Sequence, residues 1–350
     1  MKVSIGTKIK DGPWGGGNLF AINLTNYLIN NNHKVVFDLK DDDIDIILIT
    51  EPRKTSESSA FTPQDVINYC KYTNEDAIVI HRINECDERK NTNYVNKYLI
   101  HANKVADYTI FVSSWIKNLY KNQGLDVTNS SVIMAGADEQ IFNRKNFITW
   151  NHSSKIKIVT HHWGANWNKG FSIYEKLDKM LGTSKYSKKI EFTYIGNLPK
   201  NFSFSNSKII EPLSGKNLAN ELKKNHIYLT ASLNEPSGNH HIEASQCGLP
   251  ILYINSGGIP EYCEGYGEIF NPEDFESKLN KMIDDYDSYV EKMISYPYSS
   301  EKMCKEYYSL FEDLINNKTY FLEKRVSYTK NLFEKLFYRL MTNLKKTETL

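Results

Sequence analysis

Residues 227–253 read IYLTASLNEPSGNHHIEASQCGLPILY, and this stretch decides the fold class. The apolar runs at 227–230 and 250–253 predict two short buried strands, and residues 239–247 between them predict a helix. A strand, a helix and a second strand in this order are the repeating unit of a parallel sheet covered by helices. The loop at 231–238 then follows the carboxyl end of a strand, where open α/β sheets bind their ligands.

The same alternation extends outward in both directions along the chain. On the N-terminal side it predicts strands at residues 2–5, 34–38, 45–49, 77–81, 108–112 and 131–134, with helices at 18–30, 63–72, 93–106 and 114–122. Residues 136–152 lose this periodicity, as a connector does. A second series follows, with strands at 155–160, 190–195 and 208–210 and helices at 170–181 and 218–224.

This organisation predicts an α/β protein with two doubly wound, Rossmann-like domains that face each other across a cleft. The length of 350 residues is enough for two separate cores. We place the N-terminal domain at 1–140, the second domain at 141–300 and C-terminal helices at 301–350. The first of these helices is expected to pack back on the N-terminal domain.

The composition is that of an ordinary globular protein. Hydrophobic residues make up 40% and charged residues 24%, and the formal net charge of +1 lacks the basic excess that favours nucleic-acid binding. The five cysteines are odd in number and widely spaced, which argues against a disulfide framework or a structural zinc site. The N-terminus lacks a signal-peptide layout, and no run approaches about 18 apolar residues, so we expect a cytoplasmic protein.

The loop at 231–238 and the helix after it contain the residues that are best suited to bind a ligand. Gly238 lets the backbone approach a ligand closely, and the free N–H groups near Asn239 and His240 favour an anion such as a diphosphate. Glu235 precedes the helix, and Glu243 lies about one turn inside it. The two carboxylates are too far apart to act as a close catalytic pair. They can contact different parts of an elongated ligand, a sugar at Glu235 and a ribose diol at Glu243.

These residues resemble a known family, the retaining GT-B glycosyltransferases of the GT4 type, also called glycosyltransferase group 1. The hallmark of the family is a pair of glutamates separated by seven residues, followed by a CGLP-like turn and a GG-x-PE loop. Here Glu235 and Glu243 match the pair, Cys247–Pro250 match the turn and Gly257–Glu261 match the loop. The resemblance implies a GT-B fold, a nucleotide-sugar donor and transfer of a hexose-type unit with retention of anomeric configuration.

Two segments of the N-terminal domain also match this family. Gly16 and Gly17 follow the first strand and open a helix, as the family's glycine-rich loop near donor and acceptor does. The loop does not match the GxGxxG pattern of dinucleotide-binding proteins, because Phe20 stands at the third glycine position, and this disfavours an oxidoreductase. His81 closes a strand where the family often has a histidine that contacts the transferred sugar, and Arg82 follows it.

Lys169 and Gly170 match a KG pair of the family, in which the lysine and an arginine several residues earlier hold the diphosphate. That arginine is missing here. Its substitute is left open between His162, Arg82 and backbone N–H groups. By the resemblance, the catalytic residues are His81, Glu235 and Lys169, since a fixed cation beside the diphosphate stabilises the departing nucleotide.

Three hypotheses of function follow. The first is a glycosyltransferase that needs no metal or cofactor and transfers sugar from a nucleotide-sugar donor to a glycan or lipid-linked acceptor. The second is a nucleotide-sugar epimerase or a phosphorylase, because fold alone does not fix the reaction. The third is a non-catalytic sugar-binding protein. From Leu332 onward, apolar residues share one helical face, which predicts packing on the body or, as an alternative, a peripheral membrane or oligomer contact.

Overall fold

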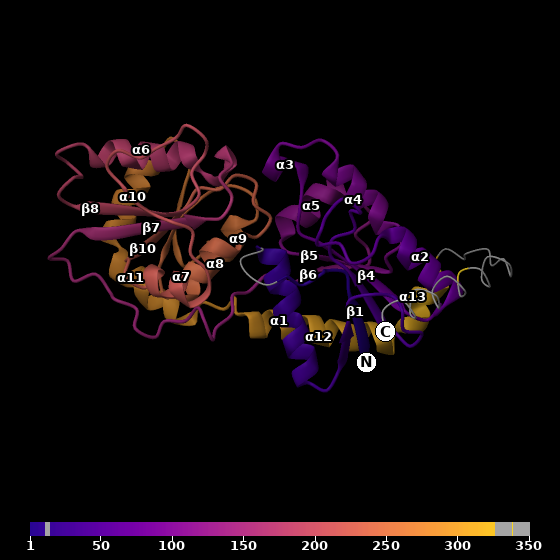
Figure 1. Ribbon diagram of the computed structural model, residues 1–350. Coiled ribbons are helices and arrows are strands. Elements are labelled where there is room, and N and C mark those ends of the chain that lie inside the picture. Colours follow the sequence, from indigo (N-terminus) through magenta and orange to yellow (C-terminus); the bar gives the residue numbers. More distant parts are fainter. Residues whose placement is uncertain (11–14, 326–337, 339–350) are drawn as a thin grey trace.

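The computed structural model describes residues 1–10, 15–325 and 338, and these form two α/β lobes that lie side by side (Figure 1). Each lobe contains one six-stranded sheet whose neighbouring strands all pair in parallel. The predicted fold class, two doubly wound Rossmann-like domains, is confirmed. Apart from residue 338, the helix predicted from Leu332 lies outside the described residues.

The sheet of the N-terminal lobe has the strand order β2-β1-β3-β4-β5-β6. Its strands are β1 (Lys2–Ile5), β2 (Lys34–Val36), β3 (Ile46–Ile49), β4 (Ile78–Ile83), β5 (Tyr108–Phe111) and β6 (Ser130–Val132). Its helices are α1 (Gly16–Asn30), α2 (Pro63–Tyr72), α3 (Asp87–Lys90), α4 (Val95–Asn103) and α5 (Ser114–Asn122). The strand order reverses between β1 and β3, so the loops after these two strands flank a switch point of the kind that binds ligands.

Local sequence signals account for these elements. Strand β3 consists of four consecutive apolar residues that are all buried, as expected for a parallel strand covered on both faces. Thr62 and Asp65 form a capping box at the start of α2, and Pro63 occupies its first turn. Ser113 caps α5 by accepting a hydrogen bond from the amide of Ile116.

The sheet of the C-terminal lobe has the order β12-β11-β10-β7-β8-β9 and reverses between β7 and β10. Its strands are β7 (Ile156–His162), β8 (Ile190–Gly196), β9 (Lys208–Ile210), β10 (Ile227–Thr230), β11 (Ile251–Ile254) and β12 (Gly267–Phe270). Its helices are η1 (Trp167–Lys169), α6 (Phe171–Leu181), α7 (Gly215–Leu222), α8 (Asn239–Gln246), α9 (Ile259–Cys263), α10 (Phe275–Asp284), α11 (Tyr286–Lys292) and η2 (Met293–Ser295). Lys169 follows β7 and Glu235 follows β10, so the two residues lie on the two sides of this switch point.

The chain crosses between the lobes at two adjacent places. Ala137 pairs with Ser299 in an isolated parallel bridge, and the Ser300 amide donates to the Ala137 carbonyl at 2.7 Å. A side chain at Gly136 would place its Cβ 2.0 Å from the Ser299 carbonyl oxygen, so only glycine fits this crossing. The domain limits expected near residues 140 and 300 stay predictions, and the two crossings lie close to both of them.

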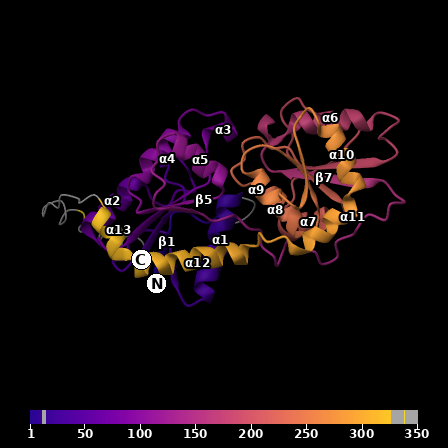
Figure 2. The same cartoon turned by 180° about the vertical axis from the view of Figure 1, so that it is seen from behind.

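After the second crossing, α12 (Ser300–Asn316) and α13 (Lys318–Lys324) run back along the N-terminal lobe (Figure 2). Tyr307 and Phe311 of α12 are buried in the same apolar cluster as Phe20 of α1. Arg325 then pairs with the buried carboxylate of Asp107, its Nε 2.9 Å from Oδ1. Helices α12 and α13 therefore belong to the N-terminal lobe.

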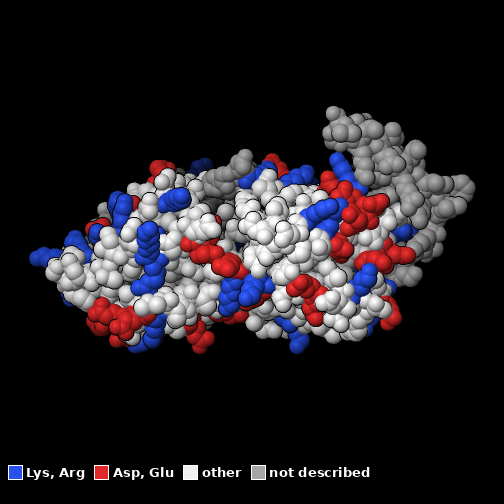
Figure 3. Space-filling model, turned by 90° about the horizontal axis from the view of Figure 1, so that it is seen from below, with Lys and Arg blue, Asp and Glu red and all other residues white. Residues whose placement is uncertain are grey.

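The predicted elements leave out several that the structure contains. The helices α3, η1, α9 and η2 have only three to five residues and are too short for a helical period to show. The predicted elements also leave out β12, α10 and α11, which lie between residues 267 and 292. Acidic and basic side chains are interspersed over the face drawn in Figure 3. Within the described part of the chain, no helix has both the length and the apolar character that a membrane span requires.

Candidate active site

The carboxylate of Glu235 lies between one cation from each lobe. Lys169 of the same lobe places its Nζ 2.6 Å from Oε2, and Arg89 of the N-terminal lobe places its Nε 2.8 Å from Oε1. Glu235 and Lys169 are 6% and 9% exposed, so this is a buried cluster. Arg89 reaches it because α3 follows β4, at the edge of its sheet that faces the other lobe (Figure 1).

The charges of this cluster depend on one another. Burial alone would raise the pKa of the Glu235 carboxyl, but the positive charges of Lys169 and Arg89 have the larger combined effect. The resulting pKa is lowered to about 2. Burial lowers the pKa of the Lys169 ammonium, while the Glu235 carboxylate opposes this effect. Glu235 is therefore ionised at neutral pH and can accept hydrogen bonds from a ligand.

Gly238 lies directly beside this carboxylate and before the first residue of α8. Its φ of +80° is one that residues with a side chain rarely adopt. An added Cβ would lie 2.8 Å from Cε1 of His241 and 3.0 Å from Cγ of Glu235. This close packing leaves the helix N-terminus, with its free N–H groups and partial positive charge, next to Glu235.

The glycine loop of the N-terminal lobe meets this helix N-terminus. A Cβ on Gly16 would lie 2.9 Å from the side-chain oxygen of Asn239, the first residue of α8. Gly16 is itself the first residue of α1, so the N-termini of two helices from different lobes are neighbours. Gly17 is exposed, and a Cβ there would meet no atom within 4 Å.

Glu243 lies one turn into α8 and is held by a histidine. Its Oε2 is 3.0 Å from Nε2 of His161, the penultimate residue of β7, and the other ring nitrogen of His161 is 3.2 Å from the Tyr228 hydroxyl. Glu243 is 8% exposed. His161 was not among the predicted site residues, although it is adjacent to His162 at the end of the same strand.

His162, His240 and His241 are buried around the start of α8. Burial lowers the pKa of His162 and His240 well below the usual value, and that of His241 to about 3, so all three rings are neutral at pH 7. Nε2 of His162 is hydrogen-bonded to the Tyr174 hydroxyl at 2.7 Å, and Nε2 of His240 is hydrogen-bonded to the Thr230 hydroxyl at 2.8 Å. Both ring nitrogens of His241 lack a hydrogen-bond partner among the described residues.

His81 and Arg82 lie within β4 and contact their own lobe. His81 is fully buried, and its Nδ1 is 2.9 Å from the Asn103 side-chain oxygen, while Nε2 has no described partner. Burial lowers the pKa of His81 to about 4, so its ring is neutral. Arg82 stacks over the Phe20 ring, with its guanidinium carbon 4.0 Å from the ring centre. A sugar contact by His81 stays a prediction.

Which group replaces the missing arginine stays a prediction. His162 is neutral, and Arg82 lies over Phe20 under α1, whereas Arg89 reaches the Lys169–Glu235 pair. Sequence reasoning missed Arg89, because α3 is a four-residue helix that matches no motif and lies on the other lobe.

Further interlobe contacts hold these loops together. The Glu261 carboxylate accepts hydrogen bonds from the amides of Ser114 and Trp115, both at 2.7 Å, and so caps α5 of the opposite lobe. The Tyr262 hydroxyl accepts from the Ala135 amide and donates to the Val112 carbonyl. The last motif, Gly257–Glu261, thus joins the lobes, a role that its spacing did not indicate.

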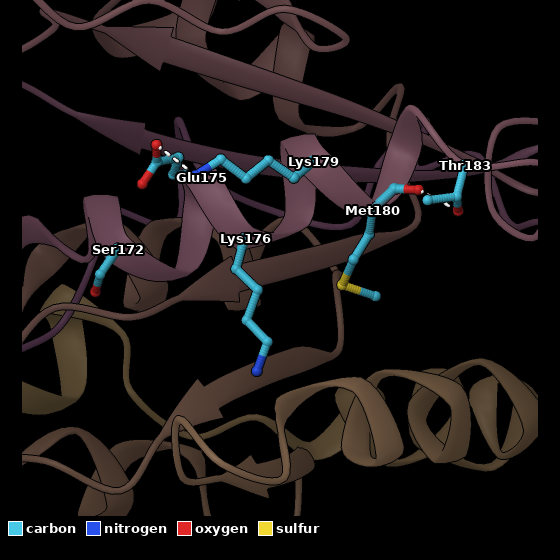
Figure 4. A pocket seen from close by; sticks show the side chains of 6 residues that line it. All are labelled: Ser172, Glu175, Lys176, Lys179, Met180 and Thr183. Atoms are coloured by element: carbon cyan, nitrogen blue, oxygen red, sulfur yellow. Dashed lines mark hydrogen bonds and ion pairs between the residues drawn. The ribbon is translucent and has the colours of Figure 1, made fainter.

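A separate hollow lies along α6 of the C-terminal lobe, and Figure 4 shows the side chains that line it. Its volume is about 440 Å³, and it is lined by Ser172, Glu175, Lys176, Lys179, Met180 and Thr183. Lys179 pairs with Glu175, and Lys176 donates to the carbonyl of Pro272. None of the motif residues lines this hollow. The residues of the sequence motifs lie instead where the two lobes meet.

Comparison with known proteins gives one family match. A family model described as glycosyl transferases group 1 matches residues 205–299, which include Glu235, Glu243 and the Gly257–Glu261 loop. A search of curated proteins gives no match.

Several solved structures align with both lobes. A glycosyltransferase from Rickettsia africae ESF-5 aligns with a TM-score of 0.65 at 15% identity, over 90% of this chain and 98% of that chain. Anabaena Alr3699/HepE in complex with UDP-glucose aligns with a TM-score of 0.64 at 11% identity, over 90% of this chain and 100% of that chain. Sucrose-phosphate synthase from Thermosynechococcus elongatus aligns with a TM-score of 0.60 at 13% identity, over 90% and 99%. The chain therefore has the GT-B fold, and its resemblance to the group 1 glycosyltransferases is confirmed.

Proposed function

We propose that this protein is a retaining glycosyltransferase. It moves a sugar from a nucleoside-diphosphate sugar to a hydroxyl group of a growing glycan, a polysaccharide or a glycolipid. The observation that carries this proposal is the ionised, buried Glu235 between Lys169 and Arg89, at the start of α8 and at the contact of two lobes. The solved relative HepE, which was crystallised with UDP-glucose, makes UDP-sugars the first donors to test.

Each part of the site has a distinct task in this proposal. Glu235 accepts hydrogen bonds from hydroxyls of the transferred sugar, and Glu243, oriented by His161, accepts them from the ribose diol. Lys169 and the N–H groups of residues 238–240 bind the diphosphate. Gly16 and Gly17 leave room for the ligand at the start of α1.

The same groups account for catalysis. Breaking the bond between sugar and phosphate builds positive charge on the sugar ring and negative charge on the departing nucleoside diphosphate. Fixed donors around that diphosphate stabilise the transition state without reorganising, and losing one such donor costs about 10²- to 10³-fold in rate. This arrangement needs no metal ion, so we expect activity to persist with a chelator present.

The proposal is tested with a panel of UDP-, GDP-, ADP- and dTDP-sugars. At least one is expected to raise the melting temperature of the full chain, because a ligand that binds only the folded state stabilises it by mass action. Release of nucleoside diphosphate with a panel of glycoside and lipid-linked acceptors then measures turnover. Proton NMR of the early product identifies the anomer, and an inverted product would overturn the retaining mechanism.

The other enzymatic and non-enzymatic hypotheses give different results in the same assays. An epimerase changes its nucleotide sugar with no acceptor present, and a phosphorylase releases sugar phosphate when inorganic phosphate is added. A non-catalytic sugar-binding protein binds a donor but turns over none of the acceptors. Transfer that depends on both donor and acceptor excludes all three.

A further inference from the structure

We propose that Arg89 of the N-terminal lobe is a second phosphate-binding cation, which leaves Glu235 and contacts the distal phosphate of the donor when the donor binds. This inference rests on the proposed function. It assigns to Arg89 the place of the arginine that the sequence lacks before Lys169. The consequence is that residues of both lobes must come together before the diphosphate is fully bound.

The contacts of Arg89 leave one edge of its guanidinium available. Nη1 donates to both carboxylate oxygens of Glu85, at 2.8 and 3.0 Å, which anchors the side chain to its own lobe. Nε lies 2.8 Å from Oε1 of Glu235 but is not aligned as a hydrogen bond, and it has no other hydrogen-bond partner among the described residues. The edge formed by Nε and Nη2 is the one that binds a phosphate through two parallel hydrogen bonds.

The surroundings of this edge attract an anion. The cluster of Arg89, Lys90, Lys169, Glu85 and Glu235 contains three cations and two carboxylates, so its net charge is positive. The N-termini of α1 and α8 add two partial positive charges where Gly16 meets Asn239. The unpartnered ring nitrogens of His241, beside Gly238, offer a further polar contact to a ligand.

Lys169 alone provides too little charge for a diphosphate, which carries at least two negative charges. The histidines around α8 are neutral and do not add to it. Arg89 is the cation that already meets Lys169 through their shared partner, Glu235. Glu235 is assigned to the sugar, which is attached to the distal phosphate, so Arg89 lies nearest to that phosphate and not to the one next to ribose.

The experiment compares the dissociation constants of UDP and UMP for wild-type protein and Arg89→Gln, with ADP and AMP, GDP and GMP, and dTDP and dTMP as further pairs. A charge-assisted hydrogen bond contributes about 10- to 100-fold in affinity. Arg89→Gln is therefore expected to weaken binding of the diphosphate at least about tenfold and that of the monophosphate less than about threefold. Arg89→Lys, which keeps the charge but not the two-pronged geometry, is expected to fall between wild type and Arg89→Gln.

Lys90→Gln is the matched control. Lys90 is the next residue along α3 and pairs with Glu85 at 2.8 Å, but it does not contact Glu235. If Arg89 acted only through net charge, Lys90→Gln and Arg89→Gln would weaken UDP binding equally, and the proposal would be wrong.

A second variant separates phosphate binding from a purely structural role. In a Glu235→Gln background the ion pair with Arg89 is absent, and we expect Arg89→Gln still to weaken UDP binding more than UMP binding. If the effect of Arg89→Gln disappears in this background, or is equal for UDP and UMP, Arg89 serves only to pair with Glu235. If wild-type protein binds none of the nucleoside diphosphates, the proposed function itself fails. If wild type binds one and Arg89→Gln binds it equally well, this inference alone fails.

Discussion

The side chain of Asn239, the first residue of α8, packs against Gly16, the first residue of α1. Two helices from different lobes therefore direct their N-termini toward one place. Free N–H groups and the positive end of the helix dipole favour an anion at such a position. The Lys169–Glu235–Arg89 cluster lies beside it, so the two lobes together form one polar region.

Alanine substitution should distinguish Gly16 from its neighbour Gly17. An alanine at position 16 pushes against the Asn239 amide, whereas one at position 17 meets open space. Gly17→Ala should stabilise the protein by about 0.5–1 kcal/mol, because glycine is unfavourable in a helix. Gly16→Ala should weaken donor binding with little gain in stability. Urea unfolding and UDP titration measure the two effects, and a donor affinity of Gly16→Ala equal to that of wild type would contradict the role of Gly16.

Gly238→Ala should destabilise the protein more than Gly124→Ala. Both glycines have a positive φ, of +80° and +91°, so both alanines carry a backbone strain of about 1–2 kcal/mol. Only at Gly238 does the new Cβ also collide with buried rings, those of His240 and His241, while nothing lies within 4 Å at Gly124. Thermal unfolding compares the two variants. Equal losses of melting temperature would show that the start of α8 yields easily to a side chain.

Glu243→Ala should abolish discrimination between ribose and deoxyribose in the donor. If Glu243 accepts hydrogen bonds from the ribose diol, wild-type protein binds UDP more tightly than 2′-deoxy-UDP, and the variant binds both with similar, weaker affinity. His161→Gln should reduce this discrimination in part, because His161 orients the carboxylate at 3.0 Å. Glu264, an exposed residue, provides the control Glu264→Ala. Retained discrimination in Glu243→Ala would assign ribose binding elsewhere.

Stability should fall as the pH decreases from about 6.5 to about 4. Burial lowers the pKa of His81 and of His226 to about 4 and that of His241 to about 3. At a pH between these lowered pKa values and the ordinary histidine pKa of about 6.5, the unfolded chain binds protons that the folded chain does not. The stability that is present above pH 6.5 is therefore lost on acidification.

His226→Gln tests this account away from the proposed site. His226 accepts a hydrogen bond from the Lys157 amide at 2.9 Å, and glutamine can replace that acceptor. In the variant, the unfolding free energy should depend less steeply on pH, because one proton fewer is bound on unfolding. The donor affinity should be unchanged. The same pH dependence in variant and wild type would mean that folding does not lower the pKa of His226.

The fold could be predicted from the sequence because the central strands of both sheets are buried on both faces. Strands such as β3 and β10 then appear as short apolar runs between helical segments, and the parallel arrangement follows from this alternation. The positions of Glu235, Gly238 and Glu243 relative to α8 could likewise be predicted, because they depend on residues close together in the sequence.

The interlobe contacts could not be predicted in this way. The pairing of Arg89 with Glu235 depends on how two separately folded sheets face each other, and no local pattern contains that information. Glu261 is another example, since its role in capping α5 appears only when Ser114 of the other lobe lies next to it. His81 is an example within one lobe. The apolar strand pattern indicates that its side chain is buried, but not that its ring forms a hydrogen bond with Asn103.

The most direct test of the central claim is the rate of nucleoside diphosphate release from the accepted donor, in the presence of acceptor, by wild-type protein, Lys169→Ala and Lys176→Ala. Lys176 lies on α6 and donates to the Pro272 carbonyl, so it controls for the loss of one lysine outside the site. Our account predicts a rate about 10²- to 10³-fold lower for Lys169→Ala and an unchanged rate for Lys176→Ala. Equal rates for folded Lys169→Ala and wild type would contradict it.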